Sequence, residues 1–354
     1  MVITYVFANI PADQIRIQVR CRNMADAINR TRTHRAYLLD MTSFAQNTPL
    51  AQKVCGESDL LVIYRYLYGP VLTATQYWKA RDKKVIVDFD QSVDHLNPSN
   101  PAGLFWYEGF PFEGLDLEEE SVIDPPPIEQ FKWGLAMVDA ATVPSLRLAD
   151  DWSHYTTVHK VMDYINTHHY PAAHQTHGDE IWIGTGSRVE SESLEDSGLL
   201  TAMERICQNH PRVKFVLSGM DKIEASKIDE DQLKFFAPEN FEDWVDILLT
   251  LDIGLMPIQG DYDRRLGSYD LLEFMIAKIP WIASKEPTFH NIFQYGQWVA
   301  NTPEEWEKII LDTVDQLAAH QQKAVGEPFL FALNQDISVN ISKILKIYEE
   351  IIPR

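Results

Sequence analysis

Residues 181–191 read IWIGTGSRVES, and the fold prediction rests on this stretch. An apolar strand leads directly into a turn that contains Gly186, Ser187 and Arg188. Glycine lets the backbone approach a phosphate, the serine can donate a hydrogen bond, and the arginine supplies positive charge. In open α/β sheets ligands bind outside the carboxyl ends of the strands, so the turn predicts a site for an anionic group. An ordinary turn between a strand and a helix is the alternative.

The same alternation of apolar runs and helical patterns extends along the whole chain, which is typical of parallel sheets covered by helices. Amphipathic patterns predict helices at 70–83, 196–211, 241–251 and 337–351. The predicted strands are 2–8, 36–40, 59–65, 84–90 and 141–145 in the first half, and 181–186, 213–219, 233–238, 252–257 and 279–284 in the second.

The polar segment 153–179 lacks a clear period and is predicted to be a hinge between two domains. The prediction is an α/β protein with two Rossmann-like domains, at 1–165 and 166–335. The C-terminal helix, 336–354, could pack on either domain, and packing back on the N-terminal one is expected.

Composition limits the functions to be considered. A chain of 354 residues exceeds what one hydrophobic core usually supports, so two domains are expected. With 31 basic and 52 acidic residues the net charge is −21, which disfavours nucleic acid as a partner unless basic residues are concentrated locally. Three widely spaced cysteines, no signal peptide and no membrane-spanning run predict a cytoplasmic protein.

A second anion-binding pattern lies at 260–284, GDYDRRLGSYDLLEFMIAKIPWIAS. Arg264, Arg265 and Ser268 precede an apolar helix, whose amino end is already positive, so a bound diphosphate would balance the charges. Glu273, one turn inside the helix, could accept hydrogen bonds from ribose hydroxyls. The alternative for Glu273 is a capping box with Asp270.

The strand at 84–90 ends in two carboxylates, Asp88 and Asp90. Paired aspartates at a strand end can bind a metal ion or sugar hydroxyls, or act as a base, whereas a single aspartate can simply cap the next helix. Arg65 ends the strand at 59–65 and is expected to lie nearby.

The segment 14–35 is locally basic, and Arg16 and Arg20 are spaced to share one helix face. It is either a solvated helix or a binding surface for an anionic acceptor. Histidines gather near the hinge, but their spacing matches no zinc motif. No metal is expected.

Together these features resemble the GT-B glycosyltransferases, and most closely the retaining, family-four-like enzymes that use nucleotide-sugar donors. The resemblance spans nearly the whole chain and is clearest over 179–306. It implies two Rossmann-like domains facing a cleft, with Gly186, Ser187 and Arg188 on the donor diphosphate. It also implies that Arg264, Arg265 and Ser268 meet the other side of the diphosphate. Glu273 matches the second glutamate of the family's E-x7-E motif, which holds the ribose.

The chain departs from the family pattern at several positions. Arg265 stands where the motif has its first glutamate, which normally contacts the transferred sugar. Asp270 stands where many relatives have lysine, and Lys278 where many have glycine. Asp90 takes the place of a histidine that often follows the strand at 84–90.

The resemblance therefore predicts a glycosyltransferase that moves a sugar from a nucleoside-diphosphate sugar, with retention and without a cofactor or metal. Asp88 and Asp90 are the predicted catalytic residues, and Arg16, Arg20 and Arg65 the predicted acceptor-binding residues. The acceptor is expected to be a saccharide or envelope glycan. The alternatives are a hydroxymethyl base in DNA, a protein that binds nucleotide sugars without catalysis, and an epimerase.

Overall fold

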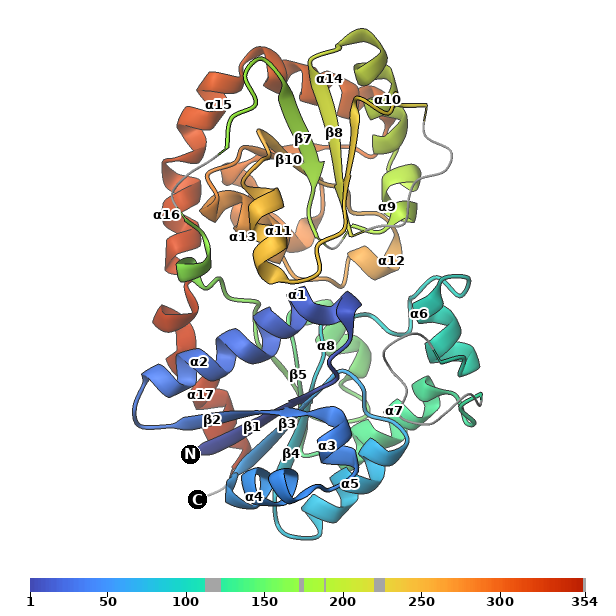
Figure 1. Cartoon of the computed structure of the whole chain (residues 1–354), viewed down its shortest axis with the longest axis vertical. Coiled ribbons are helices and arrows are strands. Elements are labelled where there is room, and N and C mark those ends of the chain that lie inside the picture. Colours follow the sequence, from blue (N-terminus) through green and yellow to red (C-terminus); the bar gives the residue numbers. More distant parts are fainter. Residues whose placement is uncertain (112–121, 172–174, 188, 220–226, 353–354) are drawn as a thin grey trace. The chain divides into compact units, whose positions relative to one another are not determined.

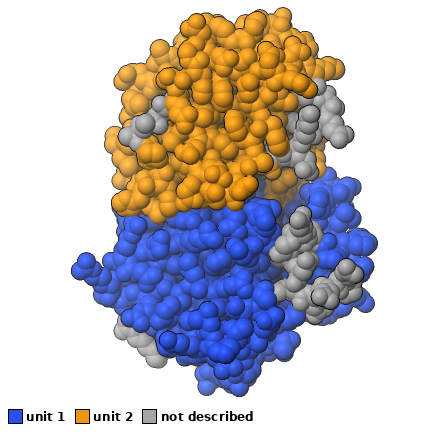
Figure 2. All heavy atoms as spheres, viewed as in Figure 1, with its two compact units in different colours: residues 1–164, 265–267, 337–354 blue, residues 165–264, 268–336 orange. Residues whose placement is uncertain are grey.

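The computed structural model describes residues 1–111, 122–171, 175–187, 189–219 and 227–352. The chain divides into two compact units, which Figure 2 colours separately. Unit 1 comprises residues 1–164, 265–267 and 337–354, and unit 2 comprises residues 165–264 and 268–336. Each unit is built on one six-stranded sheet (Figure 1).

The sheet of unit 1 is parallel throughout, in the order β2-β1-β3-β4-β5-β6. Its strands are β1 (Val2–Phe7), β2 (Arg35–Asp40), β3 (Leu60–Tyr64), β4 (Lys84–Asp88), β5 (Ala140–Val143) and β6 (Val158–Lys160). Its helices are α1 (Gln14–Ile17), α2 (Asn23–Arg30), α3 (Met41–Ala45), α4 (Pro49–Glu57), α5 (Pro70–Lys79), α6 (Pro101–Gly103), α7 (Pro127–Met137), α8 (Leu146–Trp152) and α17 (Ile337–Ile351).

One face of this sheet is covered by α2 and by the C-terminal helix α17, which lie side by side in Figure 1. Side chains alternate between the two faces of a strand, so Ile3 and Tyr5 of β1 point to the same side. They share one core cluster with Ile28 of α2 and with Ile344 and Tyr348 of α17. The last helix of the chain is therefore part of the core of unit 1.

The sheet of unit 2 is also parallel, in the order β12-β11-β10-β7-β8-β9, which is the Rossmann order. Its strands are β7 (Ile181–Thr185), β8 (Val213–Ser218), β9 (Leu233–Phe236), β10 (Ile253–Met256), β11 (Trp281–Ser284) and β12 (Gln297–Val299). Its helices are α9 (Ser191–Asp196), α10 (Leu199–Asn209), α11 (Phe241–Leu248), α12 (Gly260–Asp263), α13 (Tyr269–Ile276), α14 (Pro303–Asp315), α15 (Leu317–Ala324) and α16 (Glu327–Asn334).

Glycine allows α13 to pack closely on the centre of this sheet. A Cβ on Gly254 of β10 would lie 2.5 Å from the ring of Phe274 in α13, so only glycine fits there. The neighbouring position on β7 is Gly184. This close approach positions the amino end of α13 beside the carboxyl ends of β7 and β10.

Each strand predicted from the sequence overlaps an observed strand, whereas β6 and β12 were not predicted. β6 lies inside the segment 153–179 that was predicted to be a hinge, so that prediction was wrong for residues 158–160. Both missed strands have only three residues, and β6 is polar, so neither shows an apolar run. Within the described part of the chain, no helix combines the length and apolarity needed to cross a bilayer.

Candidate functional site

In each sheet the strand order reverses at one point, and this is where open α/β sheets bind ligands. In unit 1 the reversal lies between β1 and β3. Asp13 and Arg16 follow β1, and Arg65 follows β3 directly. Arg65 has a φ of +65°, a left-handed conformation that is uncommon for a residue with a side chain and that is concentrated at functional sites.

Arg65 is the centre of a buried charge cluster at this edge. Its side chain is 3% exposed and pairs with Asp13 and, at 2.6 Å, with Asp90. Tyr64 donates a hydrogen bond of 2.9 Å to Asp90, and Arg16 contacts the same carboxylate at 3.3 Å. Burial alone would raise the pKa of Asp90, but the positive charges of Arg65 and Arg16 outweigh it and hold that pKa below its usual range. Asp90 is therefore ionised and is not poised to act as a general acid or base.

Arg20 forms a second buried cluster with Asp88, the last residue of β4. Its Nε donates a hydrogen bond of 2.9 Å to Asp88, and its Nη1 donates to Asp163 at 2.9 Å and to the carbonyl of Val161 at 2.8 Å. The hydroxyl of Thr142 also donates to Asp88, at 2.5 Å. The Arg20 side chain is 1% exposed. These residues connect β4, β5 and the segment after β6.

The structure thus brings together the five site residues predicted from the first half of the chain, Arg16, Arg20, Arg65, Asp88 and Asp90. Their side chains, however, form ion pairs with one another. Only Arg16, with a side chain 19% exposed, is appreciably accessible to a ligand. Their catalytic and acceptor-binding roles stay predictions. Sequence reasoning missed Asp13 and Asp163. Asp13 could have been noticed because it lies shortly after the first strand, at the same edge, whereas nothing in the sequence marks Asp163.

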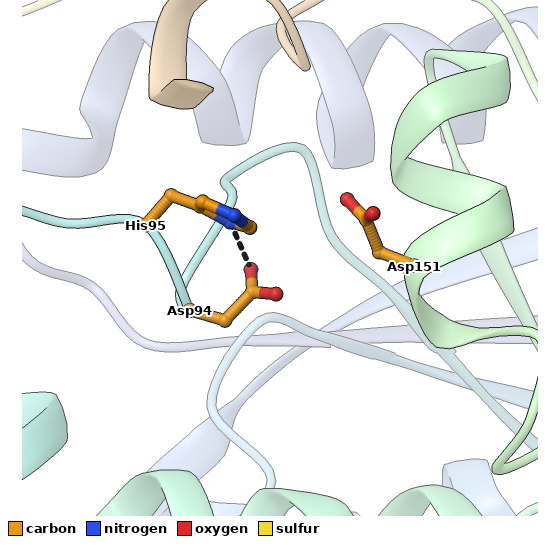
Figure 3. A group of neighbouring side chains, drawn as sticks. All are labelled: Asp94, His95 and Asp151. Carbon is orange, nitrogen blue, oxygen red and sulfur yellow. Dashed lines mark ion pairs between the residues drawn. The ribbon is translucent and has the colours of Figure 1, made fainter. Parts of the chain in front are cut away.

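Within the described residues, one group could hold a metal ion: Asp94 and His95, which follow β4, and Asp151 of α8 (Figure 3). Their ligand atoms lie within 4.8 Å of one another. The carboxylate of Asp151 is already neutralised by Arg265, whose Nε lies 2.5 Å from it. Because Arg265 is paired with one of its two carboxylates, this group is a poor metal site in the conformation observed.

Arg265 was predicted to meet the donor diphosphate. In addition to Asp151, its carbonyl accepts a hydrogen bond of 2.6 Å from Ser145, and residues 265–267 belong to unit 1. A role on the donor requires Arg265 to exchange Asp151 for the diphosphate, and that role stays a prediction.

In unit 2 the strand order reverses between β7 and β10, and the glycine turn lies at this point. Gly186 follows β7, and its amide donates to the carbonyl of Leu255 in β10 at 3.3 Å. Ser187 donates a hydrogen bond of 3.3 Å to Asp270, which is buried in the first turn of α13. Arg188 lies outside the described residues. The turn therefore contacts the amino end of α13, as a phosphate-binding turn would require.

Replacing Gly186 by alanine should destabilise unit 2. A Cβ at this position would lie 2.7 Å from the side chain of Asp270, and overpacking of this kind typically costs about 1–3 kcal/mol. The control is Gly56→Ala in α4, where a Cβ meets nothing within 4 Å. That substitution should stabilise by up to about 1 kcal/mol, because alanine favours helix more than glycine. Urea denaturation measures both, and equal effects would contradict the close approach at Gly186.

Glu273 is fully buried in α13, and Tyr170 and Trp244 donate hydrogen bonds to its carboxylate. The hydroxyl of Tyr170 lies 2.7 Å from Oε1, and the indole nitrogen of Trp244 in α11 lies 3.0 Å from the same oxygen. The capping-box alternative is wrong, because the residue that caps α13 is Ser268 and its side chain makes no capping hydrogen bond. The carboxylate instead faces polar groups of neighbouring elements, and sequence reasoning gave no sign of Tyr170 or Trp244 as its partners.

The other predicted donor residue of this loop, Arg264, is more accessible. Its side chain is 42% exposed and forms an ion pair of 3.4 Å with the buried carboxylate of Glu286, which follows β11. Arg264 is thus held near the carboxyl edge of the sheet while its guanidinium can still reach a ligand.

Asp263, at the end of α12, is a buried acid that sequence reasoning missed. Its carboxylate accepts hydrogen bonds from Ser193 at 2.6 Å and from the amide of Gln259 at 2.7 Å. Burial nevertheless dominates and raises the pKa of Asp263 to about 6, with smaller contributions from Glu192 and Asp270.

The free energy of unfolding should therefore fall as pH rises from about 4 to about 6. In this range folded Asp263 retains a proton that the unfolded chain, with a pKa near 3.9, has released. Stabilisation is thus complete below about pH 4 and lost above about pH 6, by at most about 3 kcal/mol at 1.36 kcal/mol per pKa unit. Denaturation of wild type and Asp263→Asn at several pH values measures this. Parallel curves for the two proteins would contradict it.

No family model and no curated protein sequence matches this chain. Solved structures do match. A sucrose-phosphate synthase from Thermosynechococcus elongatus is similar over 99% of this chain and 98% of its own, at 11% identity and a TM-score of 0.64. Anabaena Alr3699/HepE, in complex with UDP-glucose, is similar over 99% and 100%, at 12% identity and a TM-score of 0.61. A putative UDP-N-acetylglucosamine 2-epimerase from Listeria monocytogenes is similar over 98% and 95%, at 11% identity and a TM-score of 0.56. With two Rossmann-like units and these neighbours, the chain has the GT-B fold.

Proposed function

We propose that the protein is a glycosyltransferase that uses a nucleoside-diphosphate sugar as its donor. The observation that supports this most directly is in unit 2. Its sheet has the Rossmann order, and at the reversal point the turn of Gly186 and Ser187 contacts the amino end of α13. Backbone amides in such a turn and at a helix amino end bind phosphate oxygens. Solved structures of the same fold include a sucrose-phosphate synthase and a protein in complex with UDP-glucose.

In this proposal unit 2 binds the donor. Gly186, Ser187 and Ser268 contact the diphosphate, Arg264 neutralises part of its charge, and Glu273 accepts hydrogen bonds from the ribose. As the glycosidic bond breaks, negative charge grows on the departing diphosphate, and fixed donors and an arginine stabilise that charge more than they stabilise the bound substrate. Metal is not required for this stabilisation.

Unit 1 binds the acceptor in this proposal. We favour a saccharide over a base in DNA, because two of the three arginines predicted to bind the acceptor are buried and paired with aspartates. Arg20 and Arg65 are 1% and 3% exposed, so of these three only Arg16 is accessible. Asp90 stays ionised beside Arg65 and fits a role in binding sugar hydroxyls or stabilising positive charge on the sugar, rather than in proton transfer.

The test is thermal unfolding with a panel of nucleoside diphosphates and nucleotide sugars. A ligand at 100 times its Kd should stabilise the protein by about 2.7 kcal/mol, which is readily detected. Ser187→Ala should reduce the shift caused by the best ligand. If no nucleotide shifts the unfolding of the wild type, the proposal fails.

The epimerase is the second candidate, because a putative epimerase is among the structures of similar fold. An epimerase converts the nucleotide sugar alone, whereas a transferase needs an acceptor or releases free sugar slowly by hydrolysis. Chromatography of the donor after incubation without an acceptor distinguishes the two.

A further inference from the structure

Among the residues that the structure describes, two hydroxyl groups are buried without a hydrogen-bond partner at the carboxyl edge of the sheet in unit 2. Thr185 is the last residue of β7 and Ser218 the last of β8, and they are 2% and 3% exposed. Neither hydroxyl has a partner among the residues that the structure describes. Burying a hydroxyl without a hydrogen bond destabilises the folded protein, so such groups need an explanation. A bound ligand supplies one where the hydroxyl faces a binding site.

The register of β7 and β8 places the two hydroxyls on opposite faces of the sheet. Gly184 of β7 lies opposite Val216 of β8, and side chains alternate along parallel strands. Gly186 and Ser218, each two residues further on, are therefore on the same face of the sheet. Thr185 is on the opposite face.

The face of Ser218 is the one that the proposed donor site uses. A Cβ on Gly186 would contact Asp270 in the first turn of α13, so α13 lies over this face. Glu273 is one turn further along the same helix. Thr185 lies opposite Leu255 of β10, on the face away from α13, and is a natural control.

β8 lies beside β7 on the side away from β10, as the strand order and Figure 1 show. In Rossmann sheets a polar residue at the end of this second strand binds the ribose, while the turn after the first strand binds the phosphates. Ser218 occupies that position here, with a hydroxyl in place of a carboxylate.

We propose that Ser218 hydrogen-bonds the nucleoside half of the donor, through an oxygen or nitrogen of the ribose or base, and not its diphosphate or sugar. The inference rests on the proposed function, because it assumes a nucleotide in unit 2. Removing the hydroxyl should have opposite effects on stability and on binding. Ser218→Ala relieves an unpaired buried group in the free protein and deletes a hydrogen bond in the complex.

The test measures melting temperature and affinity for wild type, Ser218→Ala and Thr185→Val. The probes are UDP, GDP, ADP and inorganic pyrophosphate, with the wild type identifying the best nucleotide. Ser218→Ala should raise the melting temperature by about 2–4 °C and weaken the best nucleotide about tenfold, while pyrophosphate affinity stays within about twofold. Thr185→Val should also raise the melting temperature but leave nucleotide affinity unchanged.

Three results would overturn the inference. Nucleotide binding by Ser218→Ala as tight as that of the wild type would mean that the hydroxyl makes no contact or is satisfied by a buried water. Equal losses of affinity in Ser218→Ala and Thr185→Val would mean a general effect on the sheet edge. If the wild type binds none of the nucleotides, the proposed function fails and this inference fails with it.

Discussion

Arg20→Met is expected to destabilise unit 1 by about 3–5 kcal/mol, or to prevent its folding, because it leaves buried carboxylates without their counter-charge. Arg20 binds Asp88 at the end of β4 and Asp163 after β6, with side chains 5% and 4% exposed. Neither acid can reach water without disrupting the edge of the sheet. Methionine fills a similar volume, so lost packing contributes little to the change. Chemical denaturation followed by circular dichroism measures the effect.

Arg16→Met is the matched control. Arg16 lies on the same segment and also contacts a β4-edge aspartate, but through one contact of 3.3 Å and with a side chain 19% exposed. Asp90 keeps Arg65 and Tyr64 as partners when Arg16 is removed, so the expected loss is below about 1 kcal/mol. If Arg20→Met is no less stable than Arg16→Met, the buried cluster does not stabilise the fold as described.

The pair of variants also separates structure from acceptor binding. Arg16 and Arg20 were predicted together, because a spacing of four residues suggested one exposed basic face. In the structure the side chain of Arg20 is buried, whereas that of Arg16 is partly exposed. If Arg16→Met loses acceptor binding but keeps its stability, this supports a role of Arg16 in binding the acceptor. The same test is not possible for Arg20, because its replacement is expected to destabilise unit 1.

Strand positions and strand ends could be predicted from the sequence, because buried parallel strands are continuous apolar runs and their ends are marked by the first polar residues. Asp88, Asp90 and Arg65 were placed at one edge in this way. Their partners could not be predicted, since Asp13 and Asp163 come from distant parts of the chain. Which acidic side chain an arginine contacts depends on how distant segments of the chain pack together, and not on the local sequence pattern.

Glu273 illustrates the same limit on the other sheet. Its place on a helix behind an arginine-rich loop was evident from the sequence, and so was a competing explanation as part of a capping box. The capping box failed because the helix begins at Tyr269, which puts Asp270 inside the first turn. Two side chains that do contact the carboxylate, Tyr170 and Trp244, lie 103 and 29 residues away in the chain.

Glu273→Gln is expected to weaken binding of the best nucleoside diphosphate about a hundredfold. Hydrogen bonds to a charged group contribute about 1.5–3 kcal/mol each, and the ribose offers two hydroxyls that donate to one carboxylate. The amide replaces one acceptor oxygen with a donor, which opposes both a ribose hydroxyl and the indole N–H of Trp244. The measurement is isothermal titration with the nucleotide, and with inorganic pyrophosphate as the probe that lacks a ribose.

The control is Asp336→Asn, which changes another buried carboxylate of unit 2 that accepts a hydrogen bond of 3.0 Å from the amide of Thr167. It should leave nucleotide affinity within about twofold, because neither Asp336 nor the Thr167 amide that it binds belongs to the proposed donor site. For Glu273→Gln, loss of nucleotide affinity with pyrophosphate affinity retained assigns the carboxylate to the nucleoside. Loss of both ligands would mean that the glutamate maintains the shape of the site through Tyr170 and Trp244. Retention of both affinities would mean that Glu273 does not contact the donor, because the affinity for a ribose bound by this carboxylate must depend on its charge.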